Sequence, residues 1–252
     1  MTPYYTVDGP DDAPVLVLGN SLGATLHMWD PQLPRLAERF RVVRFDTRGH
    51  GRSPVPAGPY DIGDLGRDVL ALLDALGVAR AHFCGLSLGG MVGMWLGAHA
   101  PDRVDRLVLC CTSARPGPPE AWAQRASTVR ADGLESIADV LVSRWVTAPY
   151  AARHPDRLAT LRAMIAGTPA EGYASCCGVL ERLDLTADLP AIRAATLVVH
   201  GEDDPAIPPA HSAAIAAAIP GARLALVPAA AHLANVEQVE TVTNLIMEHL
   251  DG

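Results

Sequence analysis

A serine flanked by glycines constrains the fold of this chain more than any other segment. The motif Gly85-Leu86-Ser87-Leu88-Gly89 follows the apolar stretch Ala81 to Cys84 and precedes an apolar segment that extends to His99. This context predicts a strand, a tight turn and a helix in succession. Glycine is expected on both sides because neighbouring backbone passes too close for a side chain. The turn would hold the Ser87 hydroxyl at a helix N-terminus, which stabilises negative charge, so Ser87 is the candidate nucleophile.

Strands and helices are predicted to alternate along most of the chain, which favours an α/β fold with a mostly parallel sheet and helices on both faces. The first two strands are expected to form a hairpin through Asp8-Gly9. The run VLVL at 15–18 lacks polar alternation, as is typical of a strand buried on both faces. The predicted strands are 4–7, 14–18, 41–45, 81–84, 106–111, 196–200 and 223–227, and the predicted helices between and after them are 29–39, 62–76, 87–99, 209–218 and 235–249.

The middle of the chain departs from this alternation. From about residue 115 to 190 there is no apolar strand pattern, and the segment opens with the proline- and glycine-rich RPGPPE. Helical spacing recurs at 120–131, 134–146, 155–166 and 170–182. We therefore predict a core formed by residues 1–114 and 187–252 and a helical cap inserted at 115–186.

Two later segments supply the partners that a serine nucleophile needs. A serine hydroxyl is activated by a base, usually a histidine oriented by a carboxylate. Asp203 and Asp204 follow the predicted strand at 196–200, and His232 follows the predicted strand at 223–227. Their order after Ser87 predicts a catalytic triad of serine, aspartate and histidine, and either aspartate satisfies the spacing.

Backbone amides are expected to stabilise the oxyanion of the reaction. One donor is the N–H of Leu88, directly after the nucleophile, and the other comes from the loop after the first parallel strand, GNSLGATLHMW. We assign the second donor to Leu22, because the flanking Ser21 and Gly23 are small enough for close approach of substrate.

Composition excludes several other chemistries. The 252 residues include no lysine, so all 20 basic residues are arginine, and neither a Schiff base nor a lysine-dependent phosphate loop is available. The formal net charge of −8 gives no global attraction for nucleic acid or an anionic membrane, so we expect neither as a partner. The five cysteines include two adjacent pairs rather than metal-binding spacing, and the N-terminus has no signal-peptide pattern. We expect a cytoplasmic protein with reduced thiols and without a metal or organic cofactor.

The whole chain resembles the α/β-hydrolase superfamily, and within it the 3-oxoadipate enol-lactonases of bacterial aromatic catabolism. The resemblance covers about residues 4 to 249. It rests on the segments GNSLGATLHMWDPQ, FDTRGHGRS, AHFCGLSLGGMVGMWLG, GYASCC, GEDDPAIPP and AHLANVE. The resemblance implies an α/β-hydrolase fold, assigns the triad acid to Asp204 rather than Asp203, and makes Asp46, Arg48 and His50 parts of a structural turn near the oxyanion loop.

The resemblance also implies a substrate and a pathway. A carboxylic-ester hydrolase of this kind opens an anionic five-membered enol-lactone to 3-oxoadipate in the β-ketoadipate pathway, through an acyl-enzyme and without a cofactor. The substrate carboxylate calls for an arginine, for which the cap offers Arg125 and Arg144, with Trp145 beside the lactone ring. Homo-oligomers are compatible with the sequence, which does not specify them.

Three other functions fit the same motifs. One is a general carboxylesterase, perhydrolase or carbon–carbon bond hydrolase with the same triad, since fold does not fix substrate. The second is a non-catalytic ligand receptor or regulator that retains the triad, and the third is an acyltransferase. A haloalkane dehalogenase is disfavoured because it would need a carboxylate at position 87.

Overall fold

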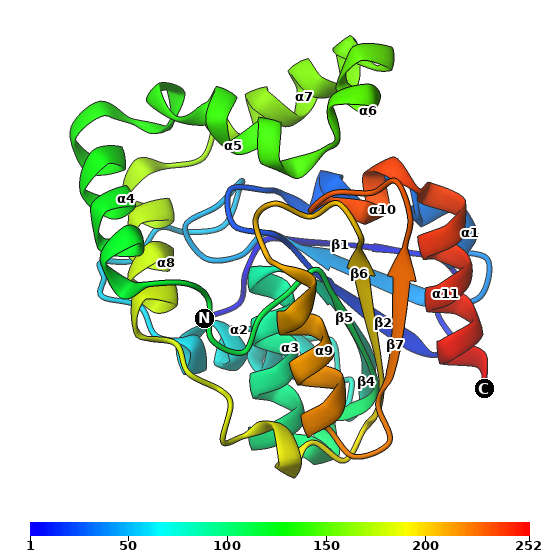
Figure 1. Ribbon diagram of the computed structural model, residues 1–252. Helices are drawn as coiled ribbons and strands as arrows, with labels where there is room; N and C mark the ends of the chain where they lie inside the picture. Colours follow the sequence, from blue (N-terminus) through cyan, green and yellow to red (C-terminus); the bar gives the residue numbers. More distant parts are fainter.

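The computed structural model describes all 252 residues, which form a central seven-stranded sheet with helices on both faces. A further group of helices lies above the end of the sheet toward which β6 and β7 point (Figure 1). The strand order is β1-β3-β2-β4-β5-β6-β7, and every pairing is parallel except β1 with β3. The strands are β1 (Tyr5–Asp8), β2 (Val15–Gly19), β3 (Arg41–Phe45), β4 (Ala81–Leu86), β5 (Val104–Cys110), β6 (Ala195–Gly201) and β7 (Arg223–Val227). The fold class predicted from the sequence is confirmed.

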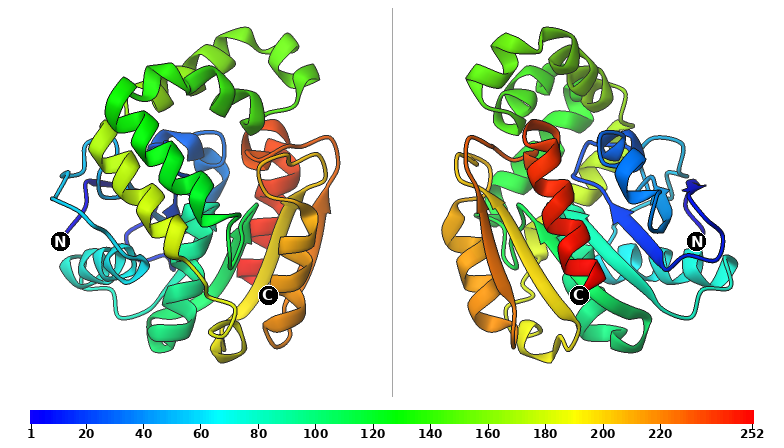
Figure 2. Two further views of the ribbon diagram at one scale, coloured as in Figure 1. Left: turned by 60° about the vertical axis from the view of Figure 1, so that its left-hand side comes forward. Right: turned by 90° about the vertical axis from the view of Figure 1, so that its right-hand side faces the viewer.

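Helices pack on both faces because the central strands are apolar on both faces. All six residues of β4 are buried, as are four of the five in β2. One face carries α2 (Ile62–Ala75), α3 (Leu88–His99) and α9 (Pro209–Ala218), and the other carries α1 (Leu33–Leu36), α10 (Ala234–Glu237) and α11 (Val239–Asp251) (Figures 1 and 2). Buried side chains of both layers and of the cap join in one apolar core of 67 residues.

The predicted hairpin between the first two strands is wrong. β1 pairs with β3, in antiparallel register from Tyr5 opposite Phe45 to Asp8 opposite Val42, and β3 separates it from β2. Gly9, at φ 93°, turns the chain against the backbone of Ala37 and Phe40 instead of into a tight two-residue turn. β2 is enclosed by two parallel neighbours, which leaves only the sheet edge for β1.

Two other predicted helices are shorter than expected. The single helix predicted at 29–39 is divided into a 3-10 turn, Leu26–Trp29, and the four-residue α1, with Pro31 and Pro34 in and beside the interruption. The closing helix is broken at Gln238, between α10 and α11. Proline cannot donate a backbone hydrogen bond, so the first interruption has a clear local cause.

The cap consists of helices α4 (Pro119–Asp132), α5 (Ala138–Trp145), α6 (Ala148–Arg153), α7 (Pro155–Ala166) and α8 (Ala170–Arg182), all between β5 and β6 (Figure 2). α4 packs against α8, and α5 against α7. The sequence did not predict α6, a short helix that Thr147 caps through its side-chain oxygen. The boundaries proposed for the cap, 115 and 186, remain a prediction.

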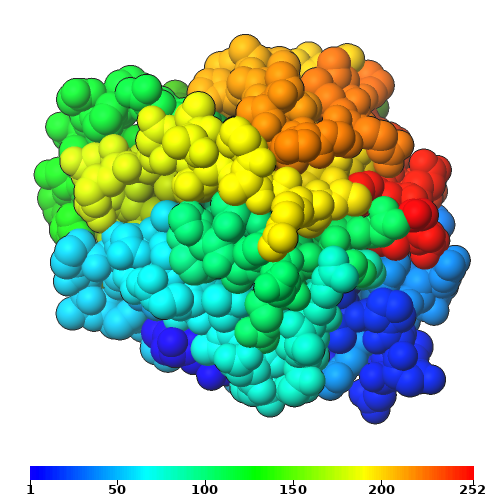
Figure 3. Space-filling view, turned by 90° about the horizontal axis from the view of Figure 1, so that it is seen from below, coloured from blue at the N-terminus to red at the C-terminus, as the bar shows by residue number.

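The chain enters and leaves the cap at neighbouring points. The Leu185 N–H donates a hydrogen bond to the Ala114 carbonyl oxygen (2.9 Å), which closes the neck of the insertion. From there the returning chain crosses the face opposite the cap, in yellow in Figure 3, before it rises into β6. None of the helices is both long and apolar enough to cross a membrane.

Candidate active site

Ser87 occupies the turn between β4 and α3, as the sequence predicts. Its backbone has φ 57° and ψ −115°, a strained conformation for a residue with a side chain. Its N–H donates to the Cys110 carbonyl (2.9 Å), which fixes the turn against β5. A Cβ atom at Gly85 would clash with the backbone of Gly89, and one at Gly89 would clash with the backbone of Gly19. Glycine is therefore required on both sides of the serine for steric reasons.

Asp204 and His232 come together from two neighbouring strand ends. His232 Nδ1 lies 2.9 Å from Asp204 Oδ2, and both side chains are buried. Asp203 is exposed and lines a different pocket, and the carboxylate that contacts the histidine is that of Asp204. A side chain at Gly201 would clash with the backbone of Ala230 and Ala231, so this glycine permits the loop that carries His232 to approach the acid.

The Asp204 carboxylate is held as an anion. Burial by itself would raise its pKa, but the attraction and hydrogen bond of the His232 ring outweigh burial, with help from backbone N–H groups. These N–H groups belong to Ala206 (2.8 Å) and Ile207 (3.0 Å), and both donate to Oδ1. The net result is a pKa below the usual value for aspartate, which suits an acid that orients a histidine.

Ser87 and His232 line one cavity beneath the cap. Neither Ser87 Oγ nor His232 Nε2 forms a hydrogen bond with another protein group, so both remain available to a substrate. Nucleophile and base commonly tighten their contact only when substrate is bound. With Nδ1 turned toward Asp204, the arrangement suits a base that receives the serine proton at Nε2.

The two amides predicted for the oxyanion have no acceptor within the protein. Around Leu22, the N–H of Ser21 donates to Met28 Sδ (3.3 Å) and that of Ala24 to the Ser21 carbonyl (3.1 Å). Around Leu88, the Gly89 N–H donates to the Asn20 carbonyl (2.9 Å). This last bond joins the nucleophile turn to the loop that bears Leu22. Leu22 also lines the cavity beside Ser87.

Arg125, Arg144 and Trp145 all line the same cavity, from helices α4 and α5. The Arg125 guanidinium stacks over the Trp122 ring, 4.6 Å from its centroid. Neither Arg125 nor Arg144 forms an ion pair with an acidic residue, although most arginines of this protein do. The cavity therefore brings two unneutralised cations close to Ser87.

Several apolar lining residues were not predicted. Met91, Leu141, Tyr173, Leu180 and Ile207 complete the cavity wall. Each has the spacing of an ordinary core residue in its helix or loop, so the sequence carries no signal that separates it from the core. Three of them, Met91, Tyr173 and Ile207, lie in segments that carry the enol-lactonase resemblance, but those segments gave no reason to assign these side chains to the site.

A buried cysteine and a buried histidine lie close to Asp204. One potential ligand atom from each of Cys111, His200 and Asp204 lies within 4.8 Å of the others. These groups already have other roles: Asp204 contacts His232, and His200 Nδ1 lies 2.8 Å from Ser212 Oγ. Burial, followed by the nearby Asp204 charge, raises the pKa of the Cys111 thiol and keeps it neutral. The cluster therefore fits a packed wall behind the acid better than a metal site.

Glu237 connects the cap to the histidine loop. Its Oε1 accepts hydrogen bonds from the Thr147 N–H (2.9 Å) and hydroxyl (2.7 Å), while Oε2 accepts from the Ala231 N–H (2.6 Å). On the other side of His232, the Leu233 N–H donates to the Trp145 carbonyl (2.7 Å). The loop that bears the candidate base is thus held by the segment that joins α5 to α6.

A serine on a strained turn after a parallel strand, with its partners at later strand ends, defines an α/β-hydrolase. Residues 14–239 match the family model described as the alpha/beta hydrolase fold, and the chain belongs to that family of hydrolases.

The resemblance to enol-lactonases extends over nearly the full length. The chain is 38% identical to 3-oxoadipate enol-lactonase 2 of Acinetobacter baylyi, across 96% of this chain and 90% of that protein. The crystal structure of the enol-lactonase from Burkholderia xenovorans superposes with a TM-score of 0.97 at 44% identity, covering 99% of this chain and 96% of that one. A putative carbamate hydrolase, RutD of Stutzerimonas stutzeri, is 32% identical over 98% of this chain and 96% of its own length.

Proposed function

We propose that this hydrolase opens 3-oxoadipate enol-lactone to 3-oxoadipate. The observation that carries the proposal is the pair Arg125 and Arg144, which line the Ser87 cavity without acidic partners. Arg125 is half-buried without a counter-ion, which favours an anionic ligand, and Arg144 is exposed where it lines the same cavity. The guanidinium fork of either residue matches a carboxylate. The similarity to enol-lactonases supports a lactone that bears such a carboxylate.

The reaction follows from the groups in the cavity. Ser87 Oγ attacks the lactone carbonyl carbon while its proton passes to His232 Nε2, and Asp204 stabilises the resulting imidazolium. The Leu22 and Leu88 amides donate to the oxyanion, where one such donor contributes about 3 kcal/mol. The ring C–O bond then breaks, the enolate leaves with the proton from His232, and the enol tautomerises to the ketone.

Deacylation uses the same groups. His232 removes a proton from water, whose oxygen attacks the acyl carbon of the Ser87 ester. The C–O bond to Ser87 breaks, the serine recovers its proton, and 3-oxoadipate is released. Both half-reactions need only the triad, the two amides and the arginines, with water as co-reactant.

The primary test is the loss of the ultraviolet absorbance of the enol-lactone with purified protein. We expect rapid loss with the native chain, none with Ser87→Ala, and slow cleavage of a p-nitrophenyl ester that lacks a carboxylate. Rapid ester cleavage without lactone turnover would overturn the proposal in favour of a general esterase. A carbamate, tested in parallel with its own hydrolysis assay, examines the activity that the name of the Stutzerimonas stutzeri relative suggests.

The role of the arginines has a separate test. We expect Arg144→Ala and Arg125→Ala each to raise the KM for the lactone by about 10-fold or more, because each removes a charge-assisted contact with the carboxylate. Arg153→Ala is the matched control, since Arg153 is an exposed cap arginine that does not line the Ser87 cavity. An unchanged KM in both cavity variants would exclude them as the carboxylate site.

A further inference from the structure

The loop at residues 20–26, called here the oxyanion loop, is held in place by the segment that follows β3. The Gly23 N–H donates to His50 Nε2 (3.0 Å), and the Leu26 N–H donates to Asp46 Oδ1 (2.8 Å). Both acceptors belong to the turn with the sequence DTRGHGRS. The conformation of the loop therefore depends on side chains outside the triad and outside the substrate cavity.

The hydrogen bond to His50 lies directly beside the Leu22 amide, the assigned oxyanion donor. Gly23 has φ 80°, a conformation that glycine adopts without strain, and its N–H belongs to the peptide unit adjoining Leu22. On the other side, the Ser21 N–H is occupied by Met28 Sδ. With both neighbouring amides engaged, the direction of the free Leu22 N–H is fixed.

His50 can accept this hydrogen bond only in one protonation state. Its Nδ1 lies 3.2 Å from the Arg48 carbonyl oxygen, which accepts but cannot donate, so Nδ1 carries the proton and Nε2 is the acceptor. The side chain is fully buried and has no carboxylate partner, and burial lowers the pKa of His50 to about 4. The imidazole is thus neutral over the range in which His232 must work as a base.

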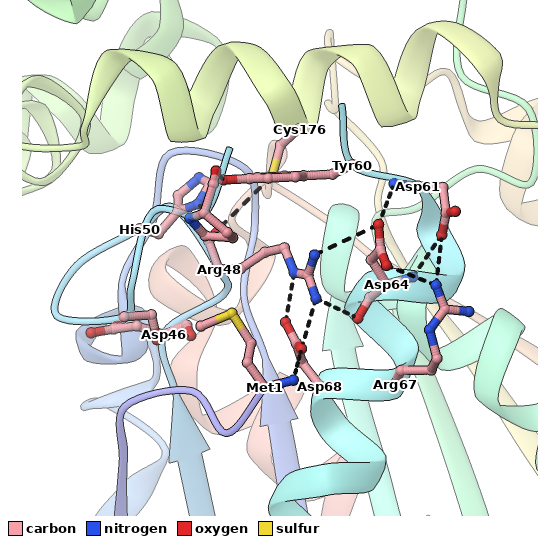
Figure 4. A network of polar contacts seen from close by, with 12 residues as sticks. Met1, Asp46, Arg48, His50, Tyr60, Asp61, Asp64, Arg67, Asp68 and Cys176 are labelled. Carbon is pink, nitrogen blue, oxygen red and sulfur yellow. Dashed lines mark hydrogen bonds and ion pairs between the residues drawn. The ribbon is translucent and has the colours of Figure 1, made fainter. Parts of the chain in front are cut away.

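His50 is itself anchored to a helix through Arg48 (Figure 4). The Arg48 guanidinium makes two hydrogen bonds with the Asp68 carboxylate on α2, at 2.7 and 2.8 Å, and one with the Asp64 carbonyl at 3.1 Å. The Cys176 thiol, on α8 of the cap, approaches the Arg48 carbonyl on the same side as Tyr60. These contacts give His50 a rigid support.

We propose that His50 is a positioning residue for the oxyanion hole, holding the Leu22 amide in the direction of the developing charge by accepting the Gly23 N–H. The proposal rests on the assignment of Leu22 and Leu88 in the proposed function. It gives the DTRGHGRS turn a part in transition-state stabilisation, although none of its residues touches substrate. Preorganised donors of this kind stabilise the transition state more than the ground state.

The test compares His50→Leu, which removes the acceptor, with His50→Gln, whose Oε1 can occupy the position of Nε2. We expect kcat to fall by about 10- to 100-fold in His50→Leu, a decrease no larger than the one caused by removing an oxyanion donor itself. The KM should change by less than about two-fold. His50→Gln is expected to recover kcat to within about three-fold of the native value. An unchanged kcat in a folded His50→Leu variant, a change in KM alone, or no recovery in His50→Gln would overturn the proposal.

Two further measurements separate this inference from the proposed function and from misfolding. Both the lactone and p-nitrophenyl acetate are used as substrates, since any acyl transfer by Ser87 needs the oxyanion hole. A chain that cleaves only the acetate ester fails the proposed function but still tests His50. Affinity for a boronic acid, which forms a tetrahedral anion on Ser87, should fall in parallel with kcat.

The native protein offers an independent test if His50→Leu does not fold. Nitrogen-15 NMR of the imidazoles should show one histidine, absent from the His50→Gln spectrum, with Nδ1 protonated and Nε2 an acceptor, unchanged from pH 8 to about pH 5. A proton on Nε2 of His50 would contradict the proposal directly, because that nitrogen could not accept from Gly23.

Discussion

At the scale of single residues, the site depends on which atom of each side chain faces its neighbour. One carboxylate oxygen of Asp204 contacts His232 and the other accepts from two backbone amides, so these bonds hold the carboxylate in one orientation. Asp203, one residue earlier, is exposed. The sequence alone does not decide which of the two aspartates is the triad acid, since both follow the same predicted strand. The enol-lactonase resemblance selects Asp204, which is the aspartate that contacts His232 in the structure.

The two aspartates provide a matched pair of variants. We expect Asp204→Asn to lower kcat by about 10³- to 10⁴-fold, because an amide facing Nδ1 can favour the wrong tautomer of His232. Asp203→Asn should leave kcat within about two-fold, as expected for an exposed side chain without a partner in the site. Steady-state kinetics on any cleaved ester or lactone measures both. Equal losses would mean that the acid has been misassigned.

At the scale of elements, the sequence predicts regular segments well and their partners less well. Helix 62–76 has an amphipathic pattern and strand 41–45 has an apolar run, and the structure contains a helix at Ile62–Ala75 and a strand at Arg41–Phe45. The pairing of β1 has no local signal, because it depends on β3 some 35 residues further along the chain. A hairpin was therefore a reasonable local prediction that the arrangement of the sheet overrode.

The contact between Glu237 and the cap gives a prediction at this scale. Glu237→Gln replaces one acceptor oxygen by an amide nitrogen that cannot accept, so either the bond from the Ala231 N–H or the bond from the Thr147 N–H is lost. We expect a loss of about 1 to 3 kcal/mol in the free energy of unfolding, typical of a hydrogen bond to a charged group. We also expect kcat/KM to fall by about 10-fold as the histidine loop loosens.

Urea unfolding and steady-state kinetics check both effects of Glu237→Gln. Glu240→Gln is the control, because it removes the same charge from an exposed position in the first turn of α11. Equal effects of the two variants would show that charge, rather than the bridge to the cap, is responsible.

At the scale of the whole molecule, the core encloses every thiol. All five cysteines are buried, and burial raises the pKa of the Cys111, Cys176 and Cys177 thiols. The pKa of the Cys110 thiol is raised by its hydrogen bond with Cys84 and then by burial. Thiol reactivity requires the thiolate and access to it. The native protein should therefore react with an aromatic disulfide reagent only as fast as it unfolds.

This expectation is measured by the colour released from such a reagent. With rising urea, the rate should follow the unfolding transition seen by circular dichroism, and the unfolded chain should release five equivalents. Rapid release of even one equivalent under native conditions would show a thiol that is more accessible than the structure allows.

The shape of the cavity is a property of the whole molecule and largely escapes the sequence. The triad could be located because each member lies at a strand end beside a motif. The placement of Arg125, Arg144 and Trp145 around the cavity depends on how α4 and α5 pack over the sheet. The sequence suggested these residues through resemblance, whereas Leu141 and Leu180 had no pattern that distinguished them from core residues.

The neck of the cap has a consequence for the evolution of such proteins. Because the chain departs and returns at the hydrogen-bonded Ala114 and Leu185, a recombination event between these points could replace the whole insertion without reordering the strands. Arg125 and Arg144, which line the cavity, would be exchanged with it, while Ser87, Asp204 and His232 lie outside the exchanged segment. Proteins related by such an exchange would keep the same core residues, and each new cap would change only the substrate that the cavity accepts.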